Sequence, residues 1–266
     1  MSLTWSKALT ARRTSASAAL SPSRVVAPAT GRGRCSESTM PGTESFATPE
    51  TGFRCDAIVL AGGESRRMGT DKAQVRVGEH RMIDLCLAEL QTQPTVGRVV
   101  VVTPSDLSVP PSVRVTCENP PYGGPVAGIE AGLAFLEDAD ADTFSAENEF
   151  VFVTAVDAPF TSCLLEVLWH KWQQIALEVE TTSQSTGVVV VDGEPLCALW
   201  RKGELARALR LLPSTRDVSV RRLIRGASAK HIQLTSAEQH WCAQDYDTPA
   251  DVAQLRAKLL GDVATE

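Results

Sequence analysis

Several features that would assign this chain to a common class are missing. No apolar run approaches the roughly 20 residues needed to cross a bilayer, which excludes a membrane-spanning protein. The seven cysteines are scattered, odd in number and include no C-x-x-C pair. This pattern disfavours a zinc site and favours buried free thiols in a reducing cytoplasm. With 43% hydrophobic and 22% charged residues, the composition is that of a soluble globular protein.

Positive charge is scarce outside the N-terminus. Residues 1–40 hold six basic residues and one acidic residue, whereas the whole chain has a net charge of −6, so residues 41–266 carry −11. Nucleic-acid binding needs clustered positive charge, so we expect no nucleic-acid partner.

The first 54 residues have little that could fold. Half of residues 1–40 are Ser, Thr or Ala, and the arginines follow no periodicity. This composition cannot bury enough apolar surface to offset its ordering entropy. We expect a disordered extension, or upstream sequence read from a start codon set too early, while an Arg- and Ser-rich targeting peptide stays an alternative. The absence of an apolar core after the basic residues disfavours a secretory signal.

A chain that starts at Met40 is therefore expected to fold and work like the full chain. The check is thermal unfolding of the two forms side by side. A melting temperature more than a few degrees lower for the shorter chain would contradict the expectation.

The body alternates strands and helices in the pattern of an α/β protein. Near-continuous apolar runs predict buried strands, and the segments between them have helical spacing, as with Ile83, Cys86, Leu87 and Leu90. Such strands indicate a parallel sheet covered on both faces. The predicted strands are 56–60, 98–103, 113–117 and 149–157.

Later residues give a more mixed pattern. "GVVVVDGEPLCALW" predicts two strands around a turn, a helix follows at about 203–212, and Thr248 or Asp247 is placed to cap a final helix. We expect one domain over 55–260, with a nucleotide half at about 55–160 and an acceptor half at about 161–260.

Three polar features follow predicted strands. They are the glycine loop after Leu60, the turn at 119–128 and Asp157. Ligands of parallel sheets bind beyond the carboxyl ends of the strands, so these features predict one site.

The first loop, "VLAGGESRRMGTDKAQ", has the materials of a phosphate site in an unusual spacing. It fits neither G-x-x-x-x-G-K-[ST] nor G-x-G-x-x-G. Its glycines let a phosphate or a base edge approach the backbone, and Arg67 and Lys72 supply positive charge. A surface loop with solvated arginines is the alternative.

The wording of this loop resembles the signature L-A-[GA]-G-x-S-x-R-M-G-x-D-K of nucleotidyltransferases, and most closely that of the molybdenum cofactor guanylyltransferases (MobA-like). "GGPVAGIEAGL" resembles that family's G-P-L-A-G turn, "VTAVDAPF" its strand ending in Asp-x-Pro-[FY], and "DYDTPADVAQL" its closing segment. The resemblance implies a Rossmann-like three-layer nucleotidyltransferase fold of the α/β class, with a mostly parallel central sheet.

The resemblance also implies a reaction and its residues. GMP is transferred from GTP to the phosphate of the molybdenum cofactor pterin, with release of pyrophosphate. Magnesium is the expected cofactor, with Asp157 as its ligand and Asp245 or Asp247 as weaker second ligands; helix capping is the alternative for Asp157 and Asp247. Lys72, Arg67 and Asp157 are the expected catalytic residues, and the expected nucleotide contacts are Leu60, Ala61, Gly62, Gly63, Lys72, Asn119 and Asp157.

Two positions depart from the family pattern, because Thr103 stands where an Asn is common and Glu118 and Asn119 stand where an Asp precedes the G-P turn. Both departures concern nucleotide contacts. On the acceptor side, Arg221, Arg222 and Arg225 are candidates for phosphate binding, with a solvated helix face as the alternative.

Alternative functions are a cytidylyltransferase acting on the same or another phosphorylated acceptor, and a nucleotide-binding accessory protein without turnover. We expect GTP rather than CTP, because Gly62 is alanine in many relatives that use CTP and its small size leaves room for a purine. The expected partners are GTP and a phosphorylated pterin, with molybdoenzymes or other cofactor-biosynthesis proteins as protein partners, in the cytoplasm.

Overall fold

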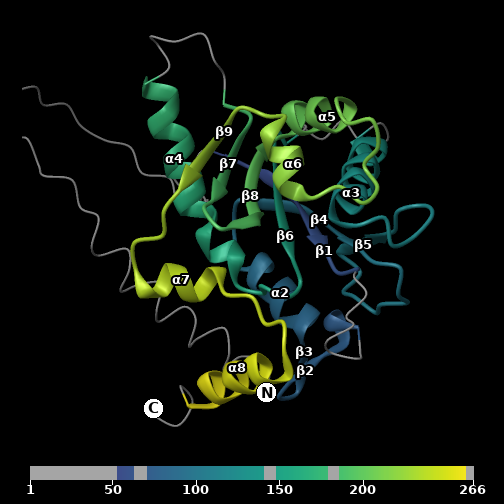
Figure 1. Cartoon of the computed structure of the whole chain (residues 1–266). Helices are drawn as coiled ribbons and strands as arrows, with labels where there is room; N and C mark the ends of the chain where they lie inside the picture. Colours follow the sequence, from purple (N-terminus) through teal and green to yellow (C-terminus); the bar gives the residue numbers. More distant parts are fainter. Residues whose placement is uncertain (1–52, 63–70, 141–147, 179–185, 262–266) are drawn as a thin grey trace, which may run out of the picture. The chain divides into compact units, whose positions relative to one another are not determined.

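The computed structural model describes residues 53–62, 71–140, 148–178 and 186–261. Those within Thr51–Arg256 belong to one compact α/β unit (Figure 1). The extension expected at residues 1–54 lies almost wholly outside the described residues, so the predicted domain limits stay a prediction.

A seven-stranded sheet forms the centre of this unit. Neighbouring strands are parallel except in the two pairs that involve β8, which runs antiparallel to both β6 and β7. The mostly parallel sheet predicted from the sequence is confirmed. Across the sheet the order is β5 (Val113–Thr116), β4 (Val96–Val102), β1 (Cys55–Leu60), β6 (Phe150–Ala155), β8 (Glu194–Arg201), β7 (Val188–Val191) and β9 (Ala229–Ile232).

Helices cover both faces of the sheet, which gives the expected three layers. On one face α3 (Pro125–Asp140), α5 (Lys202–Arg210) and α6 (Val220–Arg225) lie beside one another (Figure 1). Their apolar side chains form one core with those of the strands, including Ile58, Val100, Val153, Trp200 and Leu205. The central strands β1 and β6 are buried at every residue, as their unbroken apolar sequences predict.

The opposite face is covered by α4 (Leu165–Glu178), where aromatic rings dominate the packing. Phe150 of β6 meets Trp172 edge to face at 5.3 Å between ring centroids, and Trp169 at 5.5 Å. Edge-to-face contacts of this kind add about 0.5–1.5 kcal/mol beyond area burial. Trp169 and Trp172 therefore lie on the side of α4 that faces the sheet.

Shorter elements complete the chain. The residues after the first loop form η1 (Lys72–Gln74) and a two-stranded ribbon of β2 (Arg76–Val77) and β3 (His80–Arg81) before α2 (Met82–Gln91). Next to β6, η2 (Thr161–Leu164) packs against α2 and against α7 (Ala237–Ala243). The last helix, α8 (Pro249–Gly261), starts after Thr248.

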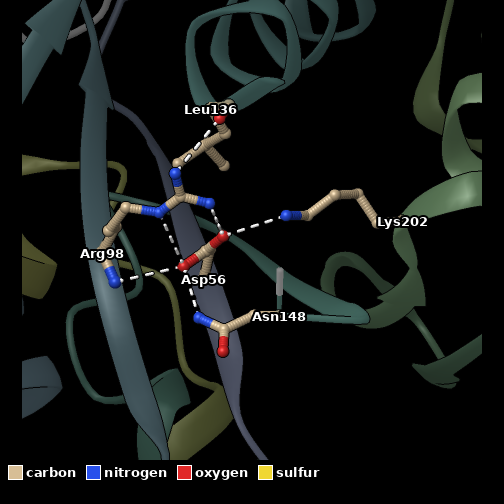
Figure 2. Close-up of polar contacts among 5 residues, drawn as sticks. All are labelled: Asp56, Arg98, Leu136, Asn148 and Lys202. Atoms are coloured by element: carbon tan, nitrogen blue, oxygen red, sulfur yellow. Dashed lines mark hydrogen bonds and ion pairs between the residues drawn. The ribbon is translucent and has the colours of Figure 1, made fainter. Parts of the chain in front are cut away.

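Asp56 forms a buried polar cluster at the amino edge of the parallel strands (Figure 2). Its carboxylate is fully buried and accepts from Arg98 Nη2 at 2.6 Å, from Asn148 Nδ2 at 2.7 Å and from Lys202 Nζ at 3.2 Å. Burial by itself raises the pKa of Asp56, but the Arg98 and Asn148 hydrogen bonds and the nearby positive charges outweigh it and hold that pKa below its usual value. The cluster therefore joins β1, β4, α5 and the start of β6 through one ionised group.

We predict that Asp56→Asn lowers the free energy of unfolding at pH 7 by about 3–5 kcal/mol, because the amide leaves the buried Lys202 and the partly exposed Arg98 without their charge partner. A depressed pKa contributes stability above the pKa of an unfolded aspartate, about 3.9, and loses it as the pH falls through the folded value. The difference from the unmodified protein should therefore shrink below about pH 4. Urea unfolding at several pH values measures it, with the exposed Asp138→Asn as the control; a difference independent of pH would contradict the ionised state of Asp56.

Every cysteine in the described part of the chain is a free thiol. Cys55, Cys86, Cys197 and Cys242 are buried, and Cys117 and Cys163 are partly buried, as the sequence predicts. None of the helices in the described ranges combines the length and apolar character that crossing a bilayer requires.

Candidate active site at the carboxyl edge of the sheet

The strand order creates a switch point between β1 and β6, and the region beyond the carboxyl ends of these two strands is called the crevice. From β1 the chain runs outward to β4 and β5 and then returns to β6 on the other side of β1. Ligands of open α/β sheets bind at such a switch point, outside the carboxyl ends of the strands. Ala61 follows β1 and Asp157 follows β6, so two of the features predicted for the site lie at this crevice.

Backbone hydrogen bonds fix the chain where β1 ends. The Ala61 N–H donates to the Val102 carbonyl at 2.9 Å, and the Val156 N–H donates to the Leu60 carbonyl at 2.9 Å. The Ala61 amide is therefore engaged within the fold. Three backbone groups can still form hydrogen bonds with a nucleotide. They are the Leu60 carbonyl through its second lone pair, the Ala61 carbonyl and the Gly62 backbone.

Gly62 lies close against the loop after β4. A Cβ atom at this position would stand 2.8 Å from Cδ of Pro104. The proline ring is anchored to its own backbone, so it cannot swing away. The small size of Gly62 is thus explained by this close approach, and the room it was expected to leave for a purine is not needed to account for it.

Lys72 lies between two carboxylates that are far apart in the sequence. Its Nζ donates to Asp157 Oδ2 at 2.8 Å and also to Asp247 Oδ1. The side chains of Lys72 and Asp157 are about one-quarter exposed, at 24% and 26%, and that of Asp247 is 40% exposed. Burial lowers the pKa of Lys72, but Asp157 and Asp247 outweigh it and raise that pKa, so the ammonium stays charged.

Hydrogen bonds fix the chain around both aspartates. The Tyr246 N–H donates to the Asp157 carbonyl at 2.9 Å, which ties the closing segment to the residue after β6. Thr248 caps α8: its Oγ1 accepts from the Asp251 N–H at 3.2 Å, and the Asp251 carboxylate accepts from the Thr248 N–H at 2.8 Å. The capping role is therefore filled by Thr248, and the Asp247 carboxylate faces Lys72.

The Asp157 carboxylate does not cap the helix that follows it. Its hydrogen-bonded partner is Lys72, and η2 starts only at Thr161, with Phe160 at its N-cap and no side-chain cap bond there. The Asp157 carboxylate is thus directed toward Lys72, and its role in the reaction stays a prediction.

Two more acidic residues, Asp245 and Glu194, lie near this ion pair. Burial, together with the charges of Asp247 and Asp157, raises the pKa of Asp245. Burial, together with the charges of Asp245 and Asp157, raises the pKa of Glu194, which the nearby Arg221 opposes. Glu194 was not predicted from the sequence; it reaches this edge because β8 runs antiparallel and so begins where β6 ends.

Other predicted residues are dispersed. Thr103 is buried, and its Oγ1 accepts from the Ser105 N–H at 3.1 Å, so it shapes the loop after β4. Asn119 is exposed in the turn after β5. Arg221, Arg222 and Arg225 are all exposed on α6, and Arg221 is the one close enough to Glu194 to affect its pKa. Gly63 and Arg67 lie outside the described residues, so their roles stay predictions.

A mostly parallel α/β sheet with a lysine and carboxylates at its switch point is a ligand-binding framework, and it is the arrangement that the resemblance to nucleotidyltransferases implies. Residues 57–234 match the family model described as "MobA-like NTP transferase domain". The chain is 30% identical over 206 residues to a probable molybdenum cofactor guanylyltransferase of Opitutus terrae, which covers 75% of this chain and 94% of that protein. The chain belongs to the MobA-like NTP transferase family.

Two further comparisons are consistent with this assignment. A probable molybdenum cofactor guanylyltransferase of Peptoclostridium acidaminophilum is 29% identical over 149 residues, 55% of this chain and 62% of that protein. The crystal structure of molybdopterin-guanine dinucleotide biosynthesis protein A from Archaeoglobus fulgidus is 19% identical, with a TM-score of 0.57, covering 77% of this chain and 99% of the other. At that identity the structural match confirms the fold.

Proposed function

We propose that this protein transfers GMP from GTP to the terminal phosphate of the molybdenum cofactor pterin and releases pyrophosphate. Membership of the family supports this. The relatives are named as guanylyltransferases, and the match to the one from Opitutus terrae covers 94% of that protein. The observation that supports it within the structure is the Lys72 ammonium held by Asp157 and Asp247 at the switch point between β1 and β6.

The proposed chemistry is an in-line displacement. An oxygen of the acceptor phosphate attacks the α-phosphorus of GTP, a new P–O bond forms, and the bond to the bridging oxygen breaks as pyrophosphate leaves. Catalysis of such a step rests on positioning and on neutralising charge around the phosphates, without a covalent enzyme intermediate. Lys72, whose raised pKa keeps it cationic, is the described group suited to the triphosphate.

The carboxylates fit a magnesium ion. Asp157 and Asp247 converge on one cationic atom, and oxygen ligands are those that magnesium prefers. Among the described residues, no group of three or more His, Cys, Asp or Glu side chains is arranged to hold a metal ion. Magnesium is usually held by one or two carboxylates together with substrate phosphates and water, so Asp157 and Asp247 would be enough protein ligands. When bound, the ion supplies positive charge to the phosphate oxygens.

On the acceptor side, Arg221 is the best placed of the three candidate phosphate ligands. Arg221 lies close enough to Glu194 for its charge to lower the pKa of that carboxyl, and the charge of Asp157 raises the same pKa. Arg222 is exposed on the same short helix. We therefore propose that the acceptor phosphate approaches from the α6 and β8 side of the crevice.

The test is pyrophosphate release from each nucleoside triphosphate with a phosphorylated pterin as acceptor. We predict that GTP gives the larger kcat/KM. A site whose polar groups pair with the guanine edge rejects a base that leaves them unpaired, by ratios that can reach ~10⁴. A CTP value equal to or above that of GTP would favour the cytidylyltransferase alternative, and no release from any triphosphate with any phosphorylated acceptor would support a nucleotide-binding protein without turnover.

A further inference from the structure

The turn that joins β5 to α3 holds an aromatic residue in a strained backbone conformation. Tyr122 has a φ of 61°, in the left-handed region that Gly and Asn adopt readily and that is a genuine outlier for a bulky residue. Its ring is not stabilised by burial, because Tyr122 is 56% exposed. A turn that served only to connect the two elements would be better built with Gly or Asn here.

A residue from the acceptor half holds this turn. Arg216 donates from Nη1 to the Pro120 carbonyl at 2.5 Å and from Nη2 to the Pro121 carbonyl at 3.4 Å. One residue further along the chain, the Asp217 N–H donates to the Gly123 carbonyl at 2.8 Å. The Gly123 N–H donates in turn to Glu118 Oε1 at 3.3 Å. These four hydrogen bonds hold the backbone around Tyr122 in its strained conformation.

Gly123 shows how closely these parts fit. A Cβ atom on Gly123 would stand 2.7 Å from Arg216 Nη1 and 2.8 Å from the Cβ of Ala127. Glycine is therefore required for the guanidinium and the first turn of α3 to approach the same backbone.

The turn lies close to the proposed nucleotide site. In the first part of α3, Gly128 packs over Leu60 at the end of β1: a Cβ atom there would stand 3.1 Å from Leu60 Cδ2. The Gly128 N–H donates to the Gly124 carbonyl at 3.1 Å, so one helical turn separates Gly124 from the residue that covers Leu60. Because β5 runs parallel to β4 and the Thr103 N–H donates to the Thr116 carbonyl, the turn after β5, which contains Tyr122, starts at the carboxyl edge of the parallel strands.

We propose that Tyr122 is a nucleotide-binding residue whose ring stacks on the base, and that Arg216 is a positioning residue that holds the turn presenting it. Strained backbone persists where the surrounding structure over-determines it, and it is concentrated at ligand-binding sites. An exposed tyrosine ring offers the flat apolar face on which a base stacks. This inference rests on the proposed function, since it needs a nucleoside triphosphate in the crevice.

The test measures GTP binding by titration calorimetry with the full chain, without the acceptor. Tyr122→Gly removes the ring and suits the backbone, so we expect GTP to bind at least about 10-fold more weakly, the size of a lost stacking contact. The melting temperature should change little, because relief of strain opposes the added freedom of the unfolded chain. Tyr122→Phe should bind GTP like the unmodified protein, and Leu211→Ala, which alters another exposed apolar side chain, is the control.

The outcomes separate the two proposals. If the unmodified protein binds GTP and Tyr122→Gly binds it equally well, the role of Tyr122 is overturned while the proposed function stands. If the unmodified protein binds no GTP, both are overturned. A large fall in melting temperature with unchanged GTP affinity would show that the turn is structural, which also overturns the inference.

Arg216 is tested through its dependence on Tyr122. We expect Arg216→Gln to raise the KM for GTP several-fold with little change in kcat, because it alters where the base is held and leaves Lys72 and Asp157 in place. In the double variant with Tyr122→Gly, GTP should bind no more weakly than in Tyr122→Gly alone, since Arg216 acts through that ring. Losses of affinity that add fully would show that Arg216 does not act through Tyr122.

Discussion

Replacing Asp157 with asparagine is expected to lower the rate of pyrophosphate release from GTP at least about 100-fold while the protein stays folded. The substitution keeps the size of the side chain and removes its charge. The Asp157 carboxylate faces Lys72 and the crevice, and its side chain is 26% exposed, so little packing depends on it. The Asp157 carbonyl, which accepts from the Tyr246 N–H, is unchanged by the substitution.

Steady-state kinetics at saturating magnesium and urea unfolding of the same preparation measure the two parts of this prediction. Asp138→Asn is a matched control, because Asp138 is an exposed carboxylate near the end of α3, away from the carboxyl edge of the strands. Unchanged turnover for Asp157→Asn would remove this carboxylate from the mechanism. A large loss of stability would assign it to the fold instead.

The central sheet was predictable because its strands are buried on both faces. The segments that became β1, β4 and β6 are short, nearly continuous apolar runs, and such runs are typical of strands that are buried on both faces of an α/β sheet. Asp157 could be assigned to the site for the same reason, since a carboxylate directly after a buried strand lies at the carboxyl edge. The identity of the switch point followed once β4 and β6 were found on opposite sides of β1.

Elements with weak local patterns were missed. β9 has four residues, of which Lys230 and His231 are exposed, so its sequence shows little of the apolar alternation that marks a strand. α7 has seven residues and buries only Cys242 and Ala243. β9 forms because it can pair with β7 at the edge of the sheet, and α7 forms because it packs against η2. A local sequence pattern does not reveal either tertiary contact.

Contacts in the site between residues far apart in the chain could not be predicted from the sequence either. Lys72 and Asp247 are 175 residues apart, and Asp247 could equally have capped α8 until Thr248 was found in that position. Glu194 lies in a hairpin without any motif, and it reaches the crevice only because β8 reverses direction. For Gly62 the sequence indicated a need for small size, and the structure supplies Pro104 as the reason.

Lys72→Ala is expected to lower kcat/KM for GTP about 10²–10³-fold, equivalent to about 2.7–4 kcal/mol of transition-state stabilisation, as for the loss of one oxyanion contact. The ammonium is the group described in the crevice that can meet charge developing on the leaving phosphates. Its ion pairs with Asp157 and Asp247 are partly exposed, with side-chain exposures of 24%, 26% and 40%, so they contribute at most about 1 kcal/mol to stability. Activity should therefore fall far more than stability.

Single-turnover and steady-state kinetics distinguish where the loss arises. A fall in kcat with a nearly constant KM indicates an interaction made in the transition state, whereas a rise in KM alone indicates uniform binding of GTP. Lys72→Arg keeps the charge but not the compact ammonium geometry, so it should recover only part of the rate. Lys230→Ala removes an exposed lysine from β9 and serves as the control. Normal kinetics for Lys72→Ala would mean that Lys72 only pairs the two carboxylates and that other residues neutralise the charge on the triphosphate.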